Sequence, residues 1–471
     1  MAATPSLTPT ETFDADFRGE RLRPDDAGYE AARIVHNGMY SRRPAVIARC
    51  TGVTDVVAAI EYARAEGLEI AVRGGAHSVQ GYASVDDGIM IDISPMKGIR
   101  VDPKSSTALA QAGLNWGEFD RETQTFGLAV TGGRISHTGI AGLTIGSGSG
   151  WLERSLGLTC DNLISADLVT ADGTIVSASE VENPELFWGL RGGGGNFGIV
   201  TSLEYRLHPV GPMVLGGMLL YRSEQAAELL PMYRDLMRHA PDEFGGAFAF
   251  LTAPPEEFVP DDLRLQPVVG IIVCHTGDEK AGRELVQILR DEQPAVDLVG
   301  AMPYVAVQQL LDASAPYGQL AYWKVDTVDE LTDETVGTIL DHGGRMPGPF
   351  SITVLEPGGR AIARVDDAAT PIGHRDAELR YYAVAAWEDP EQTESHISWA
   401  RDFHGAMEPF SSAGIQVNFL TDADDDRLRA SYGAEKYDRL VALKDEWDPE
   451  NVFRLNANVK PSGFSRSPVA D

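Results

Sequence analysis

A glycine-rich segment in the first half of the chain limits which nucleotide-binding folds the chain can adopt. Residues 191–198 read RGGGGNFG, in which Gly193, Gly195 and Gly198 have the spacing of a dinucleotide fingerprint. That fingerprint requires a strand before it and a helix after it, so that a pyrophosphate meets the N-terminus of the helix. Here ELFWGLR, before the glycines, is predicted to be helical, and IVTSLEYRL, after them, a strand. The reversed order excludes a Rossmann domain here and leaves a nicotinamide nucleotide site without support.

Two other glycine clusters are better suited to bind a phosphate-containing ligand. The first is AVRGGAHS at 71–78, where a predicted strand runs into a glycine pair, and the second is GIAGLTIGSGSGW at 139–151. Glycine lets backbone N–H groups approach an anion closely, and successive turn amides form concave anion sites. Two such loops suit a ligand that contains a pyrophosphate and is larger than a mononucleotide. The alternative is that each cluster only forms tight turns in a β-rich fold.

The patterning of the chain predicts two α+β regions that meet near Pro212. In the first, PAVIARC, EIAVRGG and GIMIDIS are predicted strands, and SADLVTADGTIVSAS is a predicted hairpin. Between them, VTDVVAAIEYARAEG is a predicted helix with Thr54 as its N-cap and Gly67 at its end. In the second region the predicted helices QAAELLPMYRDLMRHA and DEKAGRELVQILRDE alternate with strands such as QPVVGIIVCH.

The two ends of the chain have simpler patterns. Residues 1–43 are predicted to form a tail and one helix that ends near Asn37. Near the C-terminus, AEKYDRLVALKDEWDPENVF is a predicted helix that stops at Asp448 and Pro449, and RLNANVKP is a predicted extended strand.

Composition excludes several classes of function. Asp and Glu total 70 against 39 Lys and Arg, a formal net charge of −31, so nucleic-acid binding is not expected. No apolar run approaches the ~18 residues of a membrane span, and the N-terminus lacks the features of a signal peptide, so a cytoplasmic location is expected. The cysteines, Cys50, Cys160 and Cys274, are far apart and odd in number, which indicates neither a disulfide framework nor a metal site.

Several segments resemble a known family in their order and spacing: DVVAAIEYAR, AVRGGAHSVQGY, DDGIMIDIS, GLTIGSGSGWLERSLGLTCDNL, NPELFWGLRGGGGNFGIVTSLEY and WDPENVFRLNANVKP. Through them, residues 44–210 and 434–461 resemble the FAD-linked oxidases of the vanillyl-alcohol oxidase superfamily, in the berberine bridge enzyme-like branch. The middle segment is similar to the bacterial 6-hydroxy-D-nicotine oxidase group.

The resemblance implies an α+β fold of two domains, an FAD-binding α+β domain and a substrate domain with an antiparallel sheet covered by helices. The expected boundaries are 1–43 for the N-terminal tail and helix, 44–211 for the FAD-binding domain, 212–430 for the substrate domain, 431–463 for a C-terminal return to the first domain, and 464–471 for a tail.

The resemblance also implies that FAD is attached covalently through one histidine. His77 matches the histidine that bonds the 8α-methyl carbon of the flavin; the alternative is a core histidine that satisfies a hydrogen bond. Relatives with a second link have a cysteine near the positions of Ile135 to His137, where this chain has none. Cys160 follows the glycine loop instead and is expected to be a small buried apolar residue, so a second link is not expected.

Further contacts with FAD are implied at positions that match the family's motifs. Asn456 and Asn458 are two apart, so on a strand they share a face, and both are expected to reach the isoalloxazine; the alternative is turn or edge capping. The full set expected to contact FAD is Arg73, Gly74, Gly75, Ala76, His77, Ser78, Gly139, Gly142, Thr144, Gly146, Gly148, Trp151, Asp161, Asn162, Gly198, Ile199, Val200, Asn456 and Asn458.

The catalytic base is expected on strands of the substrate domain that cover the flavin. In FSITVLEPGG, Ile352, Val354 and Glu356 share one face; in ELRYYAVAAW, Tyr382 and Val384 share one face and Tyr381 lies on the other. A base sheltered from water holds a proton more readily, which favours Glu356 first. Tyr382 is second, because a tyrosine with a pKa near 10 needs a cation such as Arg380 or Lys324 to help it ionise. The alternatives are that Glu356 is a solvated strand end and that one tyrosine of the pair belongs to the core.

A third predicted strand, AGIQVNFL, has Gln416 and Asn418 on one face. In sugar-oxidising relatives a tyrosine base is found where this chain has Gln416, and glutamine is not a base near neutral pH. Gln416 and Asn418 are therefore expected to orient the substrate by hydrogen bonds.

The expected activity is oxidation of a small organic alcohol or amine by hydride transfer to FAD, with reoxidation by O₂ to give H₂O₂. The alternatives are a dehydrogenase that uses another electron acceptor, and a protein that holds flavin without turnover.

Overall fold

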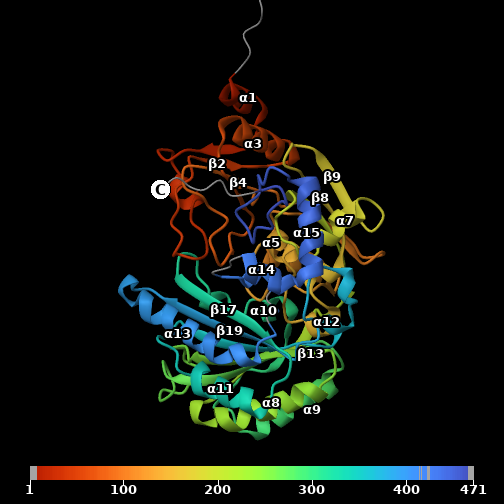
Figure 1. The fold of residues 1–471 in the computed structure, drawn as a ribbon. Coiled ribbons are helices and arrows are strands. Elements are labelled where there is room, and N and C mark those ends of the chain that lie inside the picture. The colour runs from red at the N-terminus through yellow and green to blue at the C-terminus, as the bar shows by residue number, and fades with distance from the viewer. Residues whose placement is uncertain (1–7, 413, 415, 422–424, 465–471) are drawn as a thin grey trace, which may run out of the picture.

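The computed structural model describes residues 8–412, 414, 416–421 and 425–464, and it arranges them in two halves, one above the other in Figure 1. The upper half holds residues 8–210 and the last two helices, and the lower half holds most of the described residues between them. Of the predicted C-terminal tail, residues 465–471 lie outside the described residues. Among the described residues, no helix combines the length and apolar character needed to cross a bilayer.

The first sheet of the upper half has the order β1-β2-β4-β3. The three predicted strands form its parallel part, in which β2 and β3 each pair with β4. Strand β1 adds an antiparallel edge. The bounds are β1 (Glu20–Leu22), β2 (Val46–Arg49), β3 (Ile70–Arg73) and β4 (Ile89–Asp92).

The second sheet of the upper half is antiparallel, in the order β5-β6-β10-β8-β9. Strands β8 and β9 form the predicted hairpin, whose turn has Gly173 at positive φ. Helix α7 (Pro184–Leu190) precedes the RGGGGNFG segment and β10 follows it, which confirms the reversed order. The bounds are β5 (Ile99–Asp102), β6 (Thr107–Gln111), β8 (Leu163–Val169), β9 (Ile175–Ser179) and β10 (Ile199–Arg206), while β7 (Leu128–Ala129) pairs separately with β11 (His208–Pro209).

The helices of the upper half differ in two places from the prediction. Helix α3 (Val53–Glu66) ends at Gly67 as predicted, but its N-cap is Gly52 and Thr54 lies inside the first turn. The single N-terminal helix ending near Asn37 is wrong: α1 (Pro9–Asp16), capped by Thr8, precedes strand β1, and α2 (Tyr29–Ala32) spans one turn. The remaining helices are α4 (Trp116–Gln124), α5 (Ile140–Ile145) and α6 (Glu153–Leu156).

The lower half is built on one antiparallel sheet, in the order β15-β12-β14-β13-β18-β19-β17, with β16 beside β12. Helices α8, α9, α11 and α13 cover its outer face, away from the upper half (Figure 1). Asp278 and Thr332 cap α9 and α11 by accepting backbone N–H groups. The strands are β12 (Met213–Arg222), β13 (Phe244–Thr252), β14 (Pro267–His275), β15 (Val296–Asp297), β16 (Gly300–Pro303), β17 (Leu320–Val328), β18 (Ile352–Pro357) and β19 (Leu379–Trp387). The helices are α8 (Ala226–His239), α9 (Glu279–Asp291), α10 (Tyr304–Val307), α11 (Asp333–Gly343), α12 (Ala361–Arg364) and α13 (Thr393–Met407).

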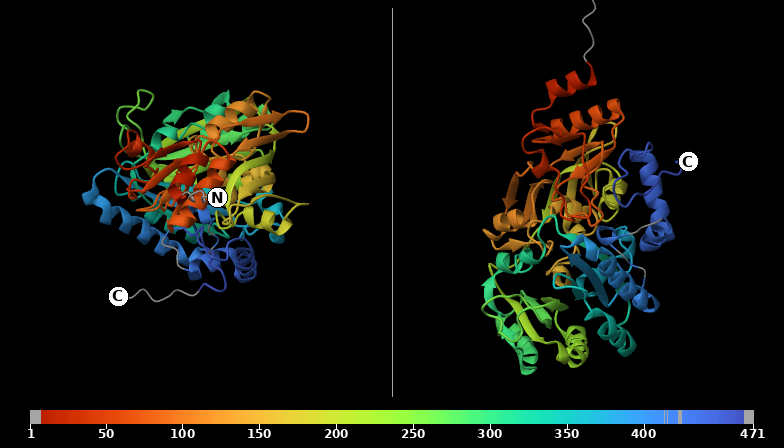
Figure 2. Two further views of the ribbon diagram at one scale, coloured as in Figure 1. Left: turned by 90° about the horizontal axis from the view of Figure 1, so that it is seen from above. Right: turned by 90° about the vertical axis from the view of Figure 1, so that its left-hand side faces the viewer.

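The C-terminal segment returns to the upper half through α14 (Asp425–Tyr432) and α15 (Ala434–Trp447), and Figure 2 shows it beside that half from two further directions. Lys444 of α15 is fully buried, and its ammonium group lies 2.7 Å from Asp448 and donates to the carbonyls of Asn196 and Phe453. The predicted strand over RLNANVKP is wrong, because the segment is irregular and bends at residues 455–457.

Candidate active site

A cavity of about 430 Å³ lies where the two halves meet. One wall comes from both glycine loops, the segment 194–200 and the C-terminal segment 453–457. The opposite wall comes from β17, β18, β19 and residues 417–420. A cavity at the junction of two such halves is the usual setting of a cofactor and its substrate.

The glycine-lined wall offers free backbone donors. Residues 74–80 all line the cavity, and no amide from Gly75 to Gln80 donates to another described group of the chain. The two loops also meet backbone to backbone: a Cβ on Gly75 would lie 2.1 Å from the amide nitrogen of Gly139. Unpaired amides in a cradle that excludes side chains fit the phosphate oxygens of a dinucleotide.

Most of the residues expected to contact FAD line this cavity, and several do not. Those that line it are Gly74, Gly75, Ala76, His77, Ser78, Gly139, Gly142, Trp151, Gly198, Ile199, Val200 and Asn456. Those absent from its lining are Arg73, Thr144, Gly146, Gly148, Asp161, Asn162 and Asn458. The exceptions fall into two groups, side chains used in packing and glycines whose neighbours approach closely.

Arg73 turns away because its guanidinium donates to the carbonyl of Ala32. Thr144 is buried and hydrogen-bonds Tyr205 at 2.8 Å, and Asp161 is paired with Arg375.

The other side chains and glycines outside the lining also support the walls. Asn162 donates to the carbonyls of Leu156 and Leu158. A Cβ on Gly146 would lie 1.9 Å from the side-chain oxygen of Asn418, and Gly148, at φ +81°, approaches Thr159.

The asparagine pair is divided by the bend in the C-terminal segment. Asn456 donates to the carbonyl of Gly195 at 3.0 Å, and its side-chain oxygen is buried without a hydrogen-bond partner among the described residues. Asn458 does not line the cavity, so the expectation that both reach the ligand from one strand face is wrong. An unpaired oxygen at the wall leaves Asn456 able to accept a hydrogen bond from a ligand.

His77 lies at one end of the cavity within a cluster of aromatic rings. Its Nε2 is 2.7 Å from Nδ1 of His137, and its Nδ1 is 3.4 Å from the hydroxyl of Thr138. The ring of His36 stacks on it with centroids 4.1 Å apart. Burial holds the pKa of His77 well below its usual value, and the neighbouring histidines add to this effect. His77 is therefore neutral at physiological pH and has a lone pair available as a nucleophile.

Cys160 is remote from this chemistry. It is fully buried in a small apolar cluster with Leu158, Ile362 and Ile372, and it does not line the cavity. Burial raises the pKa of its thiol far above the usual range, which keeps the thiol protonated and unreactive.

The facing wall confirms the predicted alternation of the strands. Ile352, Val354 and Glu356 of β18 line the cavity with Tyr382 and Val384 of β19, because Val354 pairs directly with Tyr382 in the antiparallel register. The opposite face of β19 presents Tyr381, whose hydroxyl lies 2.8 Å from Nδ1 of His404. Two further aromatic rings, Trp323 and Phe419, stack beside the wall with centroids 6.0 Å apart and complete a mainly apolar surface.

Glu356 is held in a buried ion cluster. One of its oxygens is 2.9 Å from Nε of Arg134, and the other is 2.8 Å from the guanidinium of Arg380. Arg380 also pairs with Glu153 at 2.7 Å, and Arg134 approaches the same Glu153 at 3.3 Å. Two cations and two anions compensate each other in this cluster. Glu356 is buried, so the alternative of a solvated strand end is wrong. The two guanidinium groups hold the carboxylate in place.

Tyr382 completes the cluster. Its hydroxyl donates to Glu356 at 2.8 Å and accepts from Nε of Arg380 at 2.6 Å. The expected cation is thus present, but burial raises the pKa of Tyr382 by more than Arg380 lowers it. Tyr382 is therefore a hydrogen-bond donor at physiological pH, and Glu356 is the acceptor in the pair.

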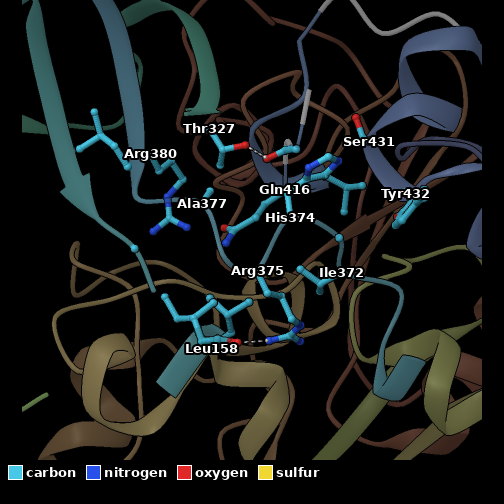
Figure 3. A pocket seen from close by; sticks show the side chains of 16 residues that line it. Leu158, Thr327, Ile372, His374, Arg375, Ala377, Arg380, Gln416, Ser431 and Tyr432 are labelled. Carbon is cyan, nitrogen blue, oxygen red and sulfur yellow. Dashed lines mark hydrogen bonds between the residues drawn. The ribbon is translucent and has the colours of Figure 1, made fainter. Parts of the chain in front are cut away.

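Gln416 and Asn418 do not lie on one face of a strand, contrary to the expectation. Positions 413 and 415 lie outside the described residues, and Val417–Phe419 forms a short 3₁₀ helix in place of the predicted strand. Asn418 lines the large cavity and donates to the carbonyl of Leu143. Gln416 lines a separate cavity of about 40 Å³ with Thr327 and His374 (Figure 3).

The site contains groups that were not predicted from the sequence, among them Arg134, Glu153 and His137. Arg134 and His137 lie on the irregular loop before α5, and Glu153 begins the short helix α6. Arg134 also covers the indole ring of Trp151 at 5.0 Å. Their nearness in sequence to the second glycine cluster was the available signal, but only contacts with segments distant in sequence assign them to the site.

Comparisons with known proteins agree with this geometry. Residues 44–179 match the family described as FAD binding domain, and residues 416–460 match the one described as berberine and berberine like. The chain is 31% identical to the (R)-6-hydroxynicotine oxidase of Paenarthrobacter nicotinovorans, over 95% of this chain and 98% of that protein. It is also 31% identical to an FAD-linked oxidoreductase of Dictyostelium discoideum, over 89% of each.

Solved structures share the whole architecture. The 6-hydroxy-D-nicotine oxidase from Arthrobacter nicotinovorans superposes with a TM-score of 0.84 and 30% identity, over 98% of this chain and 100% of that chain. The berberine bridge enzyme from Eschscholzia californica superposes with a TM-score of 0.84 and 21% identity, over 97% of this chain and 100% of that chain, which shows the fold alone.

Proposed function

The chain belongs to the berberine bridge enzyme-like FAD-linked oxidoreductases, and from this we propose that it oxidises a small organic alcohol or amine, with FAD bound covalently through His77 and O₂ as the final electron acceptor. It is an FAD-dependent oxidoreductase with the two-domain α+β fold of that family.

The observation that supports this proposal is the pairing of two different walls across one cavity. One wall has free amides and glycine backbone, and the other has an apolar aromatic surface with the carboxylate of Glu356, which is paired with Arg134. When bound, FAD supplies the acceptor for the hydride of the substrate. Phosphate oxygens suit the first wall, and the flat isoalloxazine ring suits the gap between the two walls.

The chain's own residues supply the proton acceptor. Loss of a hydride from carbon is accompanied by loss of a proton from the neighbouring O–H or N–H group. Glu356 is the proposed base, because it carries a carboxylate, lines the cavity and already accepts a hydrogen bond from Tyr382. Arg134 and Arg380 fix its position, and Asn418 is placed to orient the substrate. The apolar neighbours Trp323, Ile352 and Val384 favour a substrate with an aromatic or aliphatic body.

The test of covalent attachment uses acid precipitation of the purified protein. We expect the wild-type precipitate to remain yellow and the His77→Ala precipitate to release its FAD into the supernatant. Cys160→Ser is the matched control, because Cys160 is buried outside the cavity, and its flavin should stay attached with unchanged added mass. A changed attachment mass in Cys160→Ser, or covalent flavin in His77→Ala, would contradict a single bond through His77.

The test of turnover is anaerobic bleaching of the yellow protein by candidate alcohols and amines. A 6-hydroxynicotine is the first probe, since a relative that is 31% identical is named for its oxidation. We expect the reduced protein to reoxidise in air with one H₂O₂ formed per flavin. Slow reoxidation in air with fast reduction of an artificial acceptor would identify a dehydrogenase instead. Failure of every reductant except dithionite would favour a flavin-holding protein without turnover.

A further inference from the structure

The ring cluster around His77 contains more histidines than attachment of a cofactor requires. His36, His77, His137 and Tyr317 lie with ring centroids 4.1 to 6.0 Å apart. His36 comes from the segment after α2 and His137 from the loop before α5, so two distant segments converge on His77. Tyr317 covers the cluster and donates its hydroxyl to the carbonyl of Gly75. Such an arrangement holds the imidazole of His77 in a fixed orientation.

The closest polar contact of His77 is with His137. Nε2 of His77 lies 2.7 Å from Nδ1 of His137, a distance at which one of the two nitrogens donates a hydrogen bond to the other. His36 makes a different contact, because its Nε2 lies 3.1 Å from the carbonyl oxygen of Ala315. With Nε2 of His77 as the donor, the other nitrogen of His77, Nδ1, carries a lone pair, and the hydroxyl of Thr138 is 3.4 Å away from it.

The charges around the cluster favour proton uptake at His137. His77 is held neutral by burial, and burial lowers the pKa of His36 to about 4. Burial also lowers the pKa of His137, but the nearby Asp312 carboxylate opposes this effect. Asp312 is fixed by the backbone amide and the hydroxyl of Ser136, at 2.7 and 2.6 Å. A fixed anion beside one imidazole of three makes that imidazole the best site for an added proton.

We propose that His137 is the general base for flavin attachment, accepting the Nε2 proton of His77 as Nδ1 of His77 bonds the 8α carbon of FAD. The proposal rests on the covalent attachment proposed above and adds the residue that drives it. An imidazole that is alkylated at Nδ1 becomes cationic unless its Nε2 proton leaves, and Nδ1 of His137 lies 2.7 Å from Nε2 of His77, within reach of that proton.

The overall step is balanced with dioxygen as the oxidant. The Nε2–H bond of His77 and one C–H bond of the 8α methyl group break, and the Nδ1–C bond forms. The two protons and two electrons that are released pass to dioxygen, which becomes H₂O₂. His137 accepts the proton transiently and then releases it, so His137 is unchanged at the end of the reaction.

The test measures the rate of attachment, separately from FAD binding and from turnover. Full-length chains are synthesised in a cell-free translation, translation is stopped, FAD is added, and covalent flavin per chain is followed with time by fluorescence of denatured protein. We expect His137→Ala and His137→Asn to bind FAD but to attach it ~10²–10⁴-fold more slowly than wild type, the usual effect of removing a general base. Asparagine keeps an oxygen acceptor for Nε2 of His77, so it separates orientation from proton uptake.

Two further variants make the outcome decisive. His36→Asn is the matched control, because His36 stacks on His77 while its own Nε2 pairs with the carbonyl of Ala315, and the attachment rate of this variant should stay within a few-fold of wild type. A wild-type rate in His137→Asn would overturn the proposal by reducing His137 to an orienting group. Equal slowing in His36→Asn and His137→Asn would overturn it by assigning the effect to ring packing. Covalent flavin in His77→Ala would instead contradict the attachment site itself, and with it the role of His137.

Discussion

At the scale of single residues, the site differs most from a simple carboxylate base in how Glu356 is held. Arg134 comes from the loop before α5 and Arg380 from β19, so the two halves of the molecule each supply one cation to the same anion. The pairing fixes the direction of the Glu356 carboxylate and compensates its charge inside the protein. Tyr382 donates a hydrogen bond to the same carboxylate, so a change in the charge of Glu356 would change the strength of this hydrogen bond.

The first prediction compares the two members of this pair. Glu356→Gln keeps the shape of the side chain but removes the proton acceptor, so we expect flavin reduction by substrate to slow by ~10²–10⁴ with unchanged flavin content. Tyr382→Phe removes one hydrogen bond to Glu356 and should slow reduction by about tenfold, in line with about 1.5 kcal/mol for a hydrogen bond to a charged group. Stopped-flow reduction under anaerobic conditions measures both rates. A larger loss in Tyr382→Phe would make the tyrosine the base, and wild-type rates in both variants would place proton abstraction elsewhere.

At the scale of elements, the contact between α4 and the end of α10 joins the two halves through a buried acid. Asp120 of α4 accepts a hydrogen bond from Gln308 at 3.0 Å, and its other oxygen has no partner among the described residues. Burial raises the pKa of Asp120 to about 7, although the hydrogen bond from Gln308 opposes the shift. This contact is therefore made by a neutral carboxyl group over most of the acidic range.

The second prediction follows from the sign of that shift. Between about pH 4 and pH 7 the unfolded chain releases the proton of Asp120 while the folded protein keeps it. The free energy of unfolding therefore falls as pH rises through this window, by at most about 4 kcal/mol. Asp120→Asn removes this dependence, so its Tm relative to wild type should rise steadily from pH 4 to pH 7. Melting curves whose difference is the same at every pH would show that Asp120 is already ionised in the folded protein.

At the scale of the whole molecule, the formal net charge of −31 acts against folding by self-repulsion. Between about 0.01 M and about 1 M salt the Debye length falls from ~30 Å to ~3 Å, which screens repulsion between distant carboxylates. We therefore expect the Tm at neutral pH to rise as NaCl is added. Near pH 4.5, where part of the carboxylates is protonated, the rise should be smaller. A Tm that falls with salt would mean that the surface ion pairs outweigh the repulsion.

The sequence by itself determined the features that short windows encode. The helix-before-strand order around RGGGGNFG is set by residues within about one element of the glycines, and α7 and β10 confirm it. The alternation along β18 and β19 follows from the two-residue period of a strand, so Glu356 and Tyr382 could be assigned to one face in advance. The glycine pairs likewise indicate, from the sequence alone, positions at which two backbone segments can approach each other closely in the folded protein.

Only the tertiary structure decided what those residues meet. Arg134 and Glu153 lie in the first half of the chain and Glu356 and Arg380 in the second, and no period links the two pairs. Their mutual compensation therefore appears only when the two halves of the molecule pack. The same holds for His137, 60 residues from His77. The irregular segment around Asn456 is a place where prediction from sequence fails. Its backbone conformation depends on contacts such as the hydrogen bond from Asn456 to the carbonyl of Gly195, rather than on the local preference for a strand. Local preference fixes the elements, whereas partner, charge state and tautomer depend on long-range contacts.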